Sequence, residues 1–355
     1  MSSQHSLLHR LLFNPTYAAG LDIQDRLLRL AHVQPGKENL TALHEHPLPE
    51  GVVENGEIID EREFARNLAD ALRASGIKNT YYVTHPPMQH TAIRLLAFPP
   101  MPTKELRSAV RYEAGKSLPY ALADAAISFA PIEQGKPKKA KAKKPRRGKR
   151  RNDAPEEGDP MPQATEAKAA PPEEKKERGR GVRGGGPRAF VVAATPNAHV
   201  LKLMRVAKTA GVRLGIIEPR VIATLRALQH HQLISPDEMV LDIGEHYANL
   251  TVVIDHAVHL ARNLPYAARD LANGKQSAVD GFNRDIIATL EYVPRIKDTL
   301  LIQRLVVIGG ELHPTITTAL EGLNLRIQTP QPPEERLIGP ALTAYGLALR
   351  GARGV

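Results

Sequence analysis

The sequence contains no cysteine, which excludes a disulfide framework, a zinc site built on thiolates and a cysteine nucleophile. This composition fits a reducing cytoplasm. The chain also has no apolar run of about 18 residues, the length that a transmembrane helix requires. Residues 1–17 lack the long apolar core and the cleavage site of a signal peptide, and we expect them to form an N-terminal tail.

One internal stretch lacks large apolar side chains. Residues 136–188 contain no Leu, Ile, Phe, Tyr or Trp, so they could not bury enough apolar surface to offset the entropy cost of ordering. They carry 18 Lys and Arg against 8 Asp and Glu. Their net charge of +10 equals that of the whole chain, so the remainder is neutral. We therefore predict a disordered basic insert over residues 135–188.

The most basic part of this insert, residues 136–151, holds 11 Lys and Arg in 16 positions. Such a segment favours an acidic partner or anionic lipid, and a solvated insertion without a partner is the alternative. Nucleic acid is not favoured, because no aromatic side chain is interleaved with the basic ones to stack on bases.

The chain does contain a segment that occurs twice. Residues 20–33 read GLDIQDRLLRLAHV, and residues 239–253 read MVLDIGEHYANLTVV. Each is an apolar strand that ends near an aspartate, Asp22 or Asp242, followed by a polar turn and a second apolar strand. Internal repetition of this kind predicts a duplicated protein of two lobes, with one hairpin from each lobe facing a shared cleft.

Hydrophobic periodicity and capping residues predict the remaining elements. Helices are expected at 61–76, 101–119 (with Thr103 as N-cap), 196–211, 220–233, within 266–292, at 314–322 and at 338–351. Strands are expected at 40–46, 80–85, 91–98, 125–133, 189–195, 212–219, 257–261 and 303–308.

The insert interrupts a small domain, because a strand before it and a strand after it fit the same sheet. The expected parts are an N-terminal tail (1–17), a first lobe (18–79), a small subdomain in two parts (80–134 and 189–214) around the insert (135–188), a junction helix (215–238), a second lobe (239–337), and a closing helix and tail (338–355).

A third element, VVIGGELHP at residues 306–314, places paired glycines after an apolar strand. Together with the two hairpins it resembles the phosphate and adenosine loops of actin-like ATPases. Further passages, in matching order and spacing, resemble the type IV pilus assembly protein PilM family. They are LPEGVVENGEIID (48–60), RLLAFPPMPTKELRSAVRYEAGKSLPY (94–120, with its core at Arg111, Tyr112, Glu113 and Ala114), VVAATPNAHVLKLMRVAKTAGVRLGIIEP (191–219), VLDIGEHYANLTVV (240–253), VVIGGELHPTI (306–316) and GPALTAYGLALRG (339–351).

The resemblance covers nearly the whole chain outside the insert and the first 17 residues. It implies an actin-like α/β fold, with duplicated ribonuclease H-like lobes of the FtsA and PilM type and a small inserted α+β subdomain. It also implies a cytoplasmic protein that binds ATP and is at most a slow ATPase. Such a protein would grip the cytoplasmic N-terminal tail of a PilN-like inner-membrane protein and associate peripherally with the inner membrane through it.

A groove for this tail is expected between the first lobe and the small subdomain, lined by Arg94, Leu96, Arg107 and Arg111. Extended backbone pairing and a few apolar anchors are the usual way in which such tails dock. The machine concerned could be a pilus, a DNA-uptake system or a secretion system.

The resemblance further implies a cleft that binds ATP and Mg²⁺. Asp22 and Asp242 are expected to hold the metal through water, since Mg²⁺ keeps several waters. The second hairpin would offer an anion nest, and the paired glycines would leave room for an adenine ring or the α-phosphate. The expected nucleotide-binding residues are Asp22, Gln24, Arg26, Asp242, Gly244, His246 (with Tyr247 beside it), Gly309, Gly310 and Glu311.

The first hairpin departs from the D-I-G-S-S turn that is usual in the family. Its turn, Asp22-Ile23-Gln24-Asp25-Arg26, lacks the glycine and puts a second negative charge where the γ-phosphate would sit. Arg26 would compensate for this charge in part. Two alternatives to an ATP-binding adaptor therefore stay open: a degenerate actin-fold scaffold without nucleotide binding, and a small-molecule kinase on the same fold.

The sequence identifies no catalytic residue. Glu218 could position a water, although a structural role at the start of a helix fits it better. Gly115-Lys116-Ser117 lacks the upstream glycine of a P-loop. Three histidine pairs lack the spacing and carboxylate support of a metal site and are interpreted as surface histidines: His44/His46, His85/His90 and His230/His231.

Overall fold

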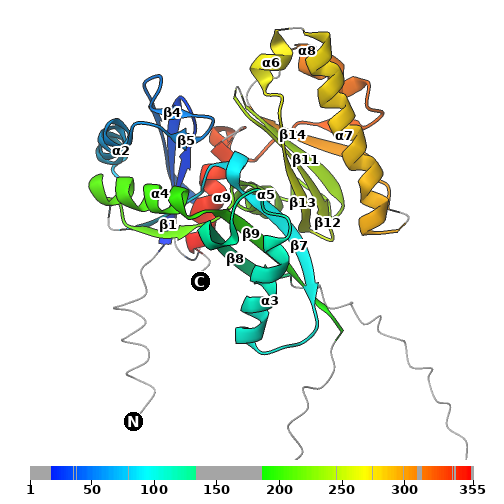
Figure 1. Cartoon of the computed structure of the whole chain (residues 1–355). Coiled ribbons are helices and arrows are strands. Elements are labelled where there is room, and N and C mark those ends of the chain that lie inside the picture. Colours follow the sequence, from blue (N-terminus) through cyan, green and yellow to red (C-terminus); the bar gives the residue numbers. More distant parts are fainter. Residues whose placement is uncertain are drawn as a thin grey trace, which may run out of the picture. The chain divides into compact units, whose positions relative to one another are not determined.

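The structure is a computed structural model (Figure 1) that describes residues 17–132 and 186–352, apart from residues 35, 37, 79, 245, 274, 299, 310–313, 338 and 340. The predictions for residues 1–16, for nearly all of the basic insert, and for Gly310 and Glu311 lie outside the described residues. Among the described helices, none has the length and apolar character needed to cross a membrane.

The first sheet has five strands in the order β10-β6-β1-β2-β3. β1 and β2 form the first predicted hairpin and pair antiparallel, with Asp22 opposite Arg29. β6 lies parallel to β1 on its other side. The strands are β1 (Tyr17–Ile23), β2 (Leu27–Val33), β3 (Leu40–Pro47), β6 (Tyr81–Thr84) and β10 (Leu214–Ile217); β4 (Val53–Glu54) and β5 (Glu57–Ile58) form a separate ribbon.

The second sheet has eight strands in the order β15-β14-β11-β12-β13-β7-β9-β8. β11 and β12 form the second predicted hairpin, and β14 lies parallel to β11 as β6 lies parallel to β1, so the two lobes repeat one pattern. The strands are β7 (Ala92–Phe98), β8 (Ala125–Pro131), β9 (Arg188–Pro196), β11 (Glu238–Ile243), β12 (Ala248–Ile254), β13 (Ala257–Leu264), β14 (Arg304–Gly309) and β15 (Arg326–Gln328).

The predicted helices are confirmed, with small shifts at their ends. The amphipathic segment after residue 60 forms α2, which ends at Gly76 with the left-handed φ of 68° that a glycine stop favours. Thr103 is the first residue of α3, whose N-cap is Pro102. The helices are α2 (Glu61–Ser75), α3 (Thr103–Gly115), α4 (Asn197–Thr209), α5 (Arg220–His230), α6 (Ala268–Ala272), α7 (Gln276–Ile296), α8 (Pro314–Glu321) and α9 (Ala341–Ala352), with short 3₁₀ turns η1 (Met88–His90), η2 (Leu122–Asp124) and η3 (Glu335–Leu337).

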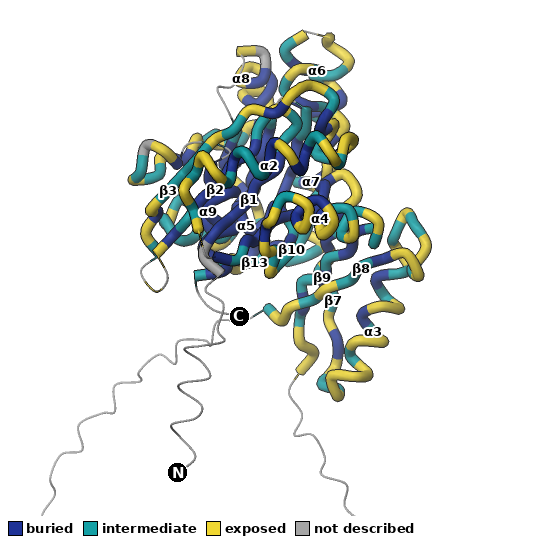
Figure 2. The backbone as a smooth tube through the Cα atoms, turned by 90° about the vertical axis from the view of Figure 1, so that its left-hand side faces the viewer, coloured by how far each residue is buried: buried dark blue, intermediate teal, exposed yellow. Residues whose placement is uncertain are grey.

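The second sheet is covered on both faces. Every residue of β11 and β12 is buried, which requires apolar partners above and below the sheet. On one face α7 and α8 contribute residues such as Phe282 and Leu320, and on the other α5 and α9 contribute residues such as Leu228 and Tyr345. Figure 2 shows α5 and α9 as largely buried elements, whereas α3 exposes most of its surface.

Helices α5 and α9 pack at backbone distance. A methyl group at Gly346 of α9 would overlap the carbonyl of Ala223 in α5. A methyl group at Gly20 of β1 would likewise overlap the carbonyl of Ala344 in α9. Glycine at these two positions lets α9 lie directly on both α5 and the first sheet, so α9 joins the two lobes.

The small subdomain consists of β7, β8, β9 and α3. β7 and β9 pair antiparallel, and the pair Leu260 and Arg94 joins β13 to β7, so these strands continue the second sheet. The strand expected at 80–85 as part of this subdomain is β6 and belongs to the first sheet, as does β10. Sequence order suggested the opposite, because β6 and β7 follow each other closely along the chain.

Candidate functional site

The two predicted hairpins bring their aspartates to one buried point. Asp22 is the last but one residue of β1, and Asp242 holds the same position in β11. Their exposed fractions are 0% and 4%. Arg220, the first residue of α5 and 3% exposed, lies between them. Three charged side chains therefore meet inside the protein, where each must be paired.

Arg220 connects the two hairpins through its guanidinium. Its Nη1 donates a hydrogen bond to Asp22 Oδ1, and its Nε donates to Asp242 Oδ2 at 3.0 Å. Its Nη2 donates to the hydroxyl of Tyr247 at 2.8 Å, and this hydroxyl donates to Asp242 Oδ1 at 3.1 Å. One guanidinium thus hydrogen-bonds to a carboxylate of each lobe.

Asp22 has further partners in the first lobe. His85 Nε2 lies 2.9 Å from Oδ1, Gln24 Nε2 donates to Oδ2 at 3.0 Å, and Arg29 Nη1 lies 3.5 Å from Oδ2. Burial raises the pKa of Asp22, but Arg220, His85 and Arg29 outweigh burial and lower that pKa well below its usual value. Burial lowers the pKa of Arg220, and its aspartate partners outweigh burial and raise it. At neutral pH this pair is ionised.

The other turn residues of the first hairpin are also bound within the protein. Asp25 accepts hydrogen bonds from the backbone N–H groups of Asn55 at 2.9 Å and Gly56 at 2.6 Å, in the turn between β4 and β5. Arg26 Nη2 donates to Glu50 at 2.9 Å on the surface. Arg26 was predicted to contact nucleotide and to compensate the charge of Asp25 in part; in the structure its guanidinium contacts Glu50.

The glycines of the second lobe serve close packing. The N–H of Gly244 donates to the carbonyl of Tyr247 at 2.9 Å, and a methyl group at Gly244 would overlap the Tyr247 ring. A methyl group at Gly309 would overlap the carbonyl of Ile243. Both glycines therefore have a structural explanation that needs no nucleotide. His246 is placed on the wall of the two cavities described next.

The space between the two hairpin turns is small. A cavity of about 30 Å³ is lined by Gln24, Asp25, Arg220 and Tyr247, among others, which is room for about two water molecules. Beyond Tyr247 lies a cavity of about 460 Å³, within the size range of small-ligand pockets. Its lining comes from the β4–β5 turn, η1, the start of β12, and the end of β13 with α6. Between the described residues of the two turns, the cavity of about 30 Å³ is smaller than the chain of phosphates of a nucleotide.

The hairpin aspartates do not fit a Mg²⁺ site. A magnesium ion keeps several waters and needs carboxylate oxygens that face a hydrated space. Asp22 and Asp242 are buried instead, and one oxygen of each accepts a hydrogen bond from Arg220. The expected role of these two residues in holding the metal differs from what the structure shows, because Arg220 supplies the positive charge between them.

The four residues expected to line a groove for a partner tail are not gathered around one cavity. Arg94 lines a cavity of about 360 Å³ formed by η1, β7, the segment after α3 and β13. Leu96 packs in the apolar cluster under α3. Arg107 lies on the exposed surface of α3, and Arg111 Nη2 donates to the carbonyl of Leu122 at 3.2 Å. The cavity walls come from the small subdomain and the second lobe, whereas the first-lobe hairpin was expected as one wall.

The structure shows the surroundings of three further residues: Glu218, His85 and His90. Glu218 forms a two-point ion pair with Arg226, at 2.6 and 2.8 Å, and Arg226 also donates to the carbonyl of Gly346. Its structural interpretation is thereby confirmed. His85 was interpreted as a surface residue but is 5% exposed and contacts Asp22. His90 lies beside Glu57, so the prediction that it has no carboxylate nearby was wrong.

Sequence reasoning missed Arg220, the residue on which the site depends. It stands in the passage GIIEPRV, directly after the proline that precedes α5. A basic residue at the start of a helix opposes the helix dipole, so a positive charge at this place is a signal that a buried anion lies nearby. That signal is weak without knowledge of which strands meet there.

No protein-family model matches the chain, and no curated protein matches it. Solved structures do match it. A chain of the PilM-PilN type IV pilus biogenesis complex superposes with a TM-score of 0.68 and 21% sequence identity, covering 94% of this chain and 98% of that one. EutJ, an ethanolamine utilization protein from Carboxydothermus hydrogenoformans, gives a TM-score of 0.48, 13% identity, and coverage of 94% and 90%. The cytoplasmic domain of EpsL, an inner membrane component of the type II secretion system of Vibrio cholerae, gives a TM-score of 0.45 and 8% sequence identity, covering 94% of each chain.

The likeness to the chain of the PilM-PilN complex confirms the predicted fold. The chain has the mixed α/β actin-like fold, and over nearly its whole length it has the fold of a chain from the PilM-PilN complex. The resemblance to the PilM family, derived from the sequence passages, is thereby confirmed at the level of the fold.

Proposed function

We propose that this chain is a PilM-like cytoplasmic adaptor of a type IV pilus or related assembly machine. It would hold the cytoplasmic N-terminal tail of a PilN-like inner-membrane protein and reach the membrane through that partner. The observation that carries the proposal is the likeness to a chain of the PilM-PilN complex, which leaves little of either chain unmatched.

The cavity beside Arg94 is the place that we propose for the tail. It holds about 360 Å³, and two arginines, Arg94 and Arg262, line it together with Tyr120. Their guanidinium groups suit the carboxylate or carbonyl oxygens of an extended peptide. The surrounding backbone comes from the ends of strands and from loops, where an extended segment can make main-chain contacts.

The proposal includes a cleft that works without a metal-bound nucleotide. Arg220 pairs with both hairpin aspartates, and the cavity between the turns holds about 30 Å³. These observations favour a scaffold whose lobes are joined by Arg220 over an adaptor that binds ATP and Mg²⁺. They also disfavour a small-molecule kinase, because the first turn binds protein groups where such an enzyme needs phosphate contacts.

Titration calorimetry with a peptide of the partner's cytoplasmic tail tests the proposal. Arg94→Glu replaces a cation of the cavity by an anion, and we expect it to weaken binding by at least about 1 kcal/mol, roughly fivefold in Kd. Arg107→Glu is the matched control, because it makes the same charge change on the exposed face of α3, outside the cavity. The control should bind the tail as the wild type does.

Two results would count against the proposal. Equal weakening by Arg94→Glu and Arg107→Glu would show a diffuse charge effect and move the tail away from the cavity. If no tail of a pilus-type inner-membrane protein binds the wild type, the adaptor function itself is wrong.

A further inference from the structure

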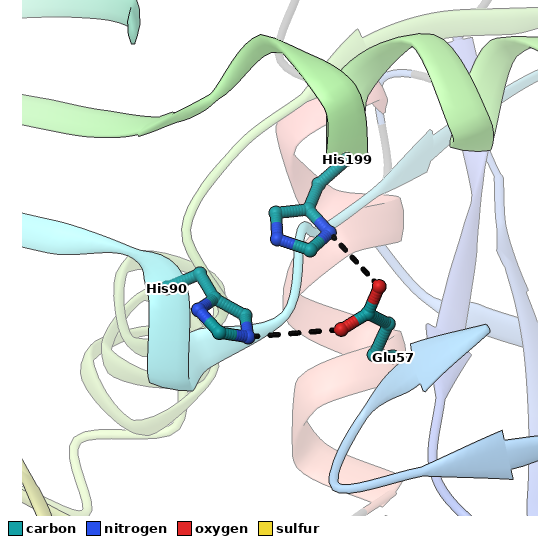
Figure 3. A group of neighbouring side chains, drawn as sticks. All are labelled: Glu57, His90 and His199. Carbon is teal, nitrogen blue, oxygen red and sulfur yellow. Dashed lines mark ion pairs between the residues drawn. The ribbon is translucent and has the colours of Figure 1, made fainter. Parts of the chain in front are cut away.

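Two histidines and a glutamate from distant parts of the chain meet at the edge of the cavity of about 460 Å³ (Figure 3). Glu57 lies in β5, His90 ends η1, and His199 lies in the first turn of α4. His90 Nε2 is 3.7 Å from Glu57 Oε2, and His199 Nδ1 is 3.8 Å from Glu57 Oε1. One ligand atom from each of the three side chains lies within 4.8 Å of the other two.

We propose that Glu57, His90 and His199 form a binding site for a divalent transition-metal cation, zinc foremost. This inference goes beyond the proposed adaptor function and does not depend on it. The site would have three protein ligands and a fourth position for water, since Glu57 and His90 both line the cavity of about 460 Å³.

The geometry suits zinc. Ligand atoms around tetrahedral zinc lie about 3.3 Å apart, given bonds of about 2.0–2.1 Å. The separations of 3.7 and 3.8 Å can close to that value by small side-chain rotations. Figure 3 shows one nitrogen of each imidazole ring directed at the Glu57 carboxylate. The two rings stack at 4.6 Å between centroids, which holds them on the same side of Glu57.

The donor set also selects the metal. Two imidazoles with one carboxylate favour zinc and its neighbours in the first transition row, whereas Mg²⁺ and Ca²⁺ prefer oxygen ligands alone.

Lys202 contacts the Glu57 carboxylate, and its positive charge opposes the cation. Its Nζ donates to Glu57 Oε1 at 2.9 Å and to the carbonyl of Ile58 at 2.8 Å. It occupies Oε1, whereas Oε2 faces His90. A cation on Glu57 would therefore bind beside an ammonium group, which predicts that removal of Lys202 strengthens metal binding.

A bound cation would fasten three segments together. The β4–β5 ribbon follows β3 of the first sheet, η1 leads from β6 into the small subdomain, and α4 follows β9. Metal binding would add to the ion pairs that already join α4 to this region, between Lys202 and Glu57 and between Arg205 and Glu61. The cation thus acts as a reversible cross-link at the edge of the cavity.

The experiment is a calorimetric titration of the tag-free full chain with Zn²⁺, and the visible absorption of Co²⁺ as a second probe. We expect one strong site, with a Co²⁺ absorption spectrum typical of tetrahedral coordination. Glu57→Gln and His199→Gln should each weaken binding at least about tenfold, and Lys202→Met should strengthen it. Circular dichroism checks that each variant is folded.

The matched control is the double variant His230→Gln with His231→Gln. It removes two neighbouring histidines at another place, where His230 lies 3.0 Å from Glu38. Its metal affinity should equal that of the wild type. Absence of a strong Zn²⁺ site in the wild type, or binding that survives in both Glu57→Gln and His199→Gln, would overturn the proposal. An affinity unchanged in Lys202→Met would do the same, because it would place the cation away from Glu57.

Discussion

A single arginine determines what the cleft of this protein can do. Arg220 lies between two aspartates that the hairpins of the two lobes present to each other, and Tyr247 completes its hydrogen bonds. A buried charge is stable only when it is paired and hydrogen-bonded. The same aspartates therefore hold the lobes together through a guanidinium, with no need for a metal ion.

Removal of Arg220 should destabilise the protein strongly. Arg220→Ala removes the guanidinium that two buried carboxylates share and leaves Asp22 with the more distant Arg29, which costs about 3–5 kcal/mol in the free energy of unfolding, measured by urea denaturation. Arg73→Ala is the control, because Arg73 is an exposed residue of α2 that pairs with Asp70 across one turn; its loss should cost less than about 1 kcal/mol.

The same variant tests whether Arg220 takes the place of a cation. Millimolar Mg²⁺ should raise the melting temperature of Arg220→Ala, because the freed carboxylates can bind it, and should leave the wild type unchanged. Destabilisation below about 1 kcal/mol, or a wild-type response to Mg²⁺ as large as that of the variant, would contradict the role given to Arg220.

Residue-level prediction from the sequence went as far as local spacing allows. The repeated D-I dipeptide located Asp22 and Asp242 at equivalent points of two hairpins, and the structure brings them together. Arg220 lies 198 positions from Asp22 along the chain, so its pairing is a product of the tertiary fold. The same holds for His199, whose neighbours Glu57 and His90 are also remote in sequence.

At the scale of elements, the crossing of α5 and α9 joins the two lobes. α9 lies on β1 through Gly20 and on α5 through Gly346, in each case against a backbone carbonyl. Arg226 of α5 adds a hydrogen bond to the carbonyl of Gly346 at 2.7 Å. Backbone contacts of this kind cannot be relieved by side-chain rotation, so the crossing depends on glycine.

Gly346→Ala tests this dependence. The added methyl group would overlap the carbonyl of Ala223 and separate the helices, and overpacking of this kind costs about 1–3 kcal/mol. Because the carbonyl belongs to the backbone and cannot rotate away, we expect a cost near the upper end of this range. The cost should therefore exceed the gain of about 1 kcal/mol that alanine brings to a helix interior, and the variant should have a lower free energy of unfolding.

The matched control for this variant is Gly322→Ala, at an exposed position where the nearest atom to an added methyl group would be 3.6 Å away. It should change the free energy of unfolding by no more than about 0.5 kcal/mol. Equal effects of the two substitutions in chemical denaturation would show that the helix crossing tolerates a side chain.

Elements were easier to predict than their grouping. Strong periodicity and glycine stops gave α2 and both hairpins nearly to the residue. The assignment of β6 to the small subdomain was wrong, because nothing in its sequence states whether its partner is β1 or β7. Strand pairing over long sequence separation is decided by packing, which a local pattern does not contain.

At the scale of the whole molecule, the fold and the cleft point to the same function. The chain matches a chain of the PilM-PilN complex over nearly its full length, and the described cleft pairs its own charges internally. Both observations support the proposal that the protein is a scaffold of the actin-like fold that binds a partner.

The most direct test of this account is a calorimetric titration of the full chain with the cytoplasmic tail of a PilN-like protein, performed once with saturating ATP and Mg²⁺ and once with a chelator and no nucleotide. The account predicts that the tail binds with the same Kd in both conditions, because Arg220 holds the lobes in their binding arrangement. Tail binding that requires ATP and Mg²⁺ would contradict it, and would show that the cleft opens to a nucleotide as an ATP-dependent switch.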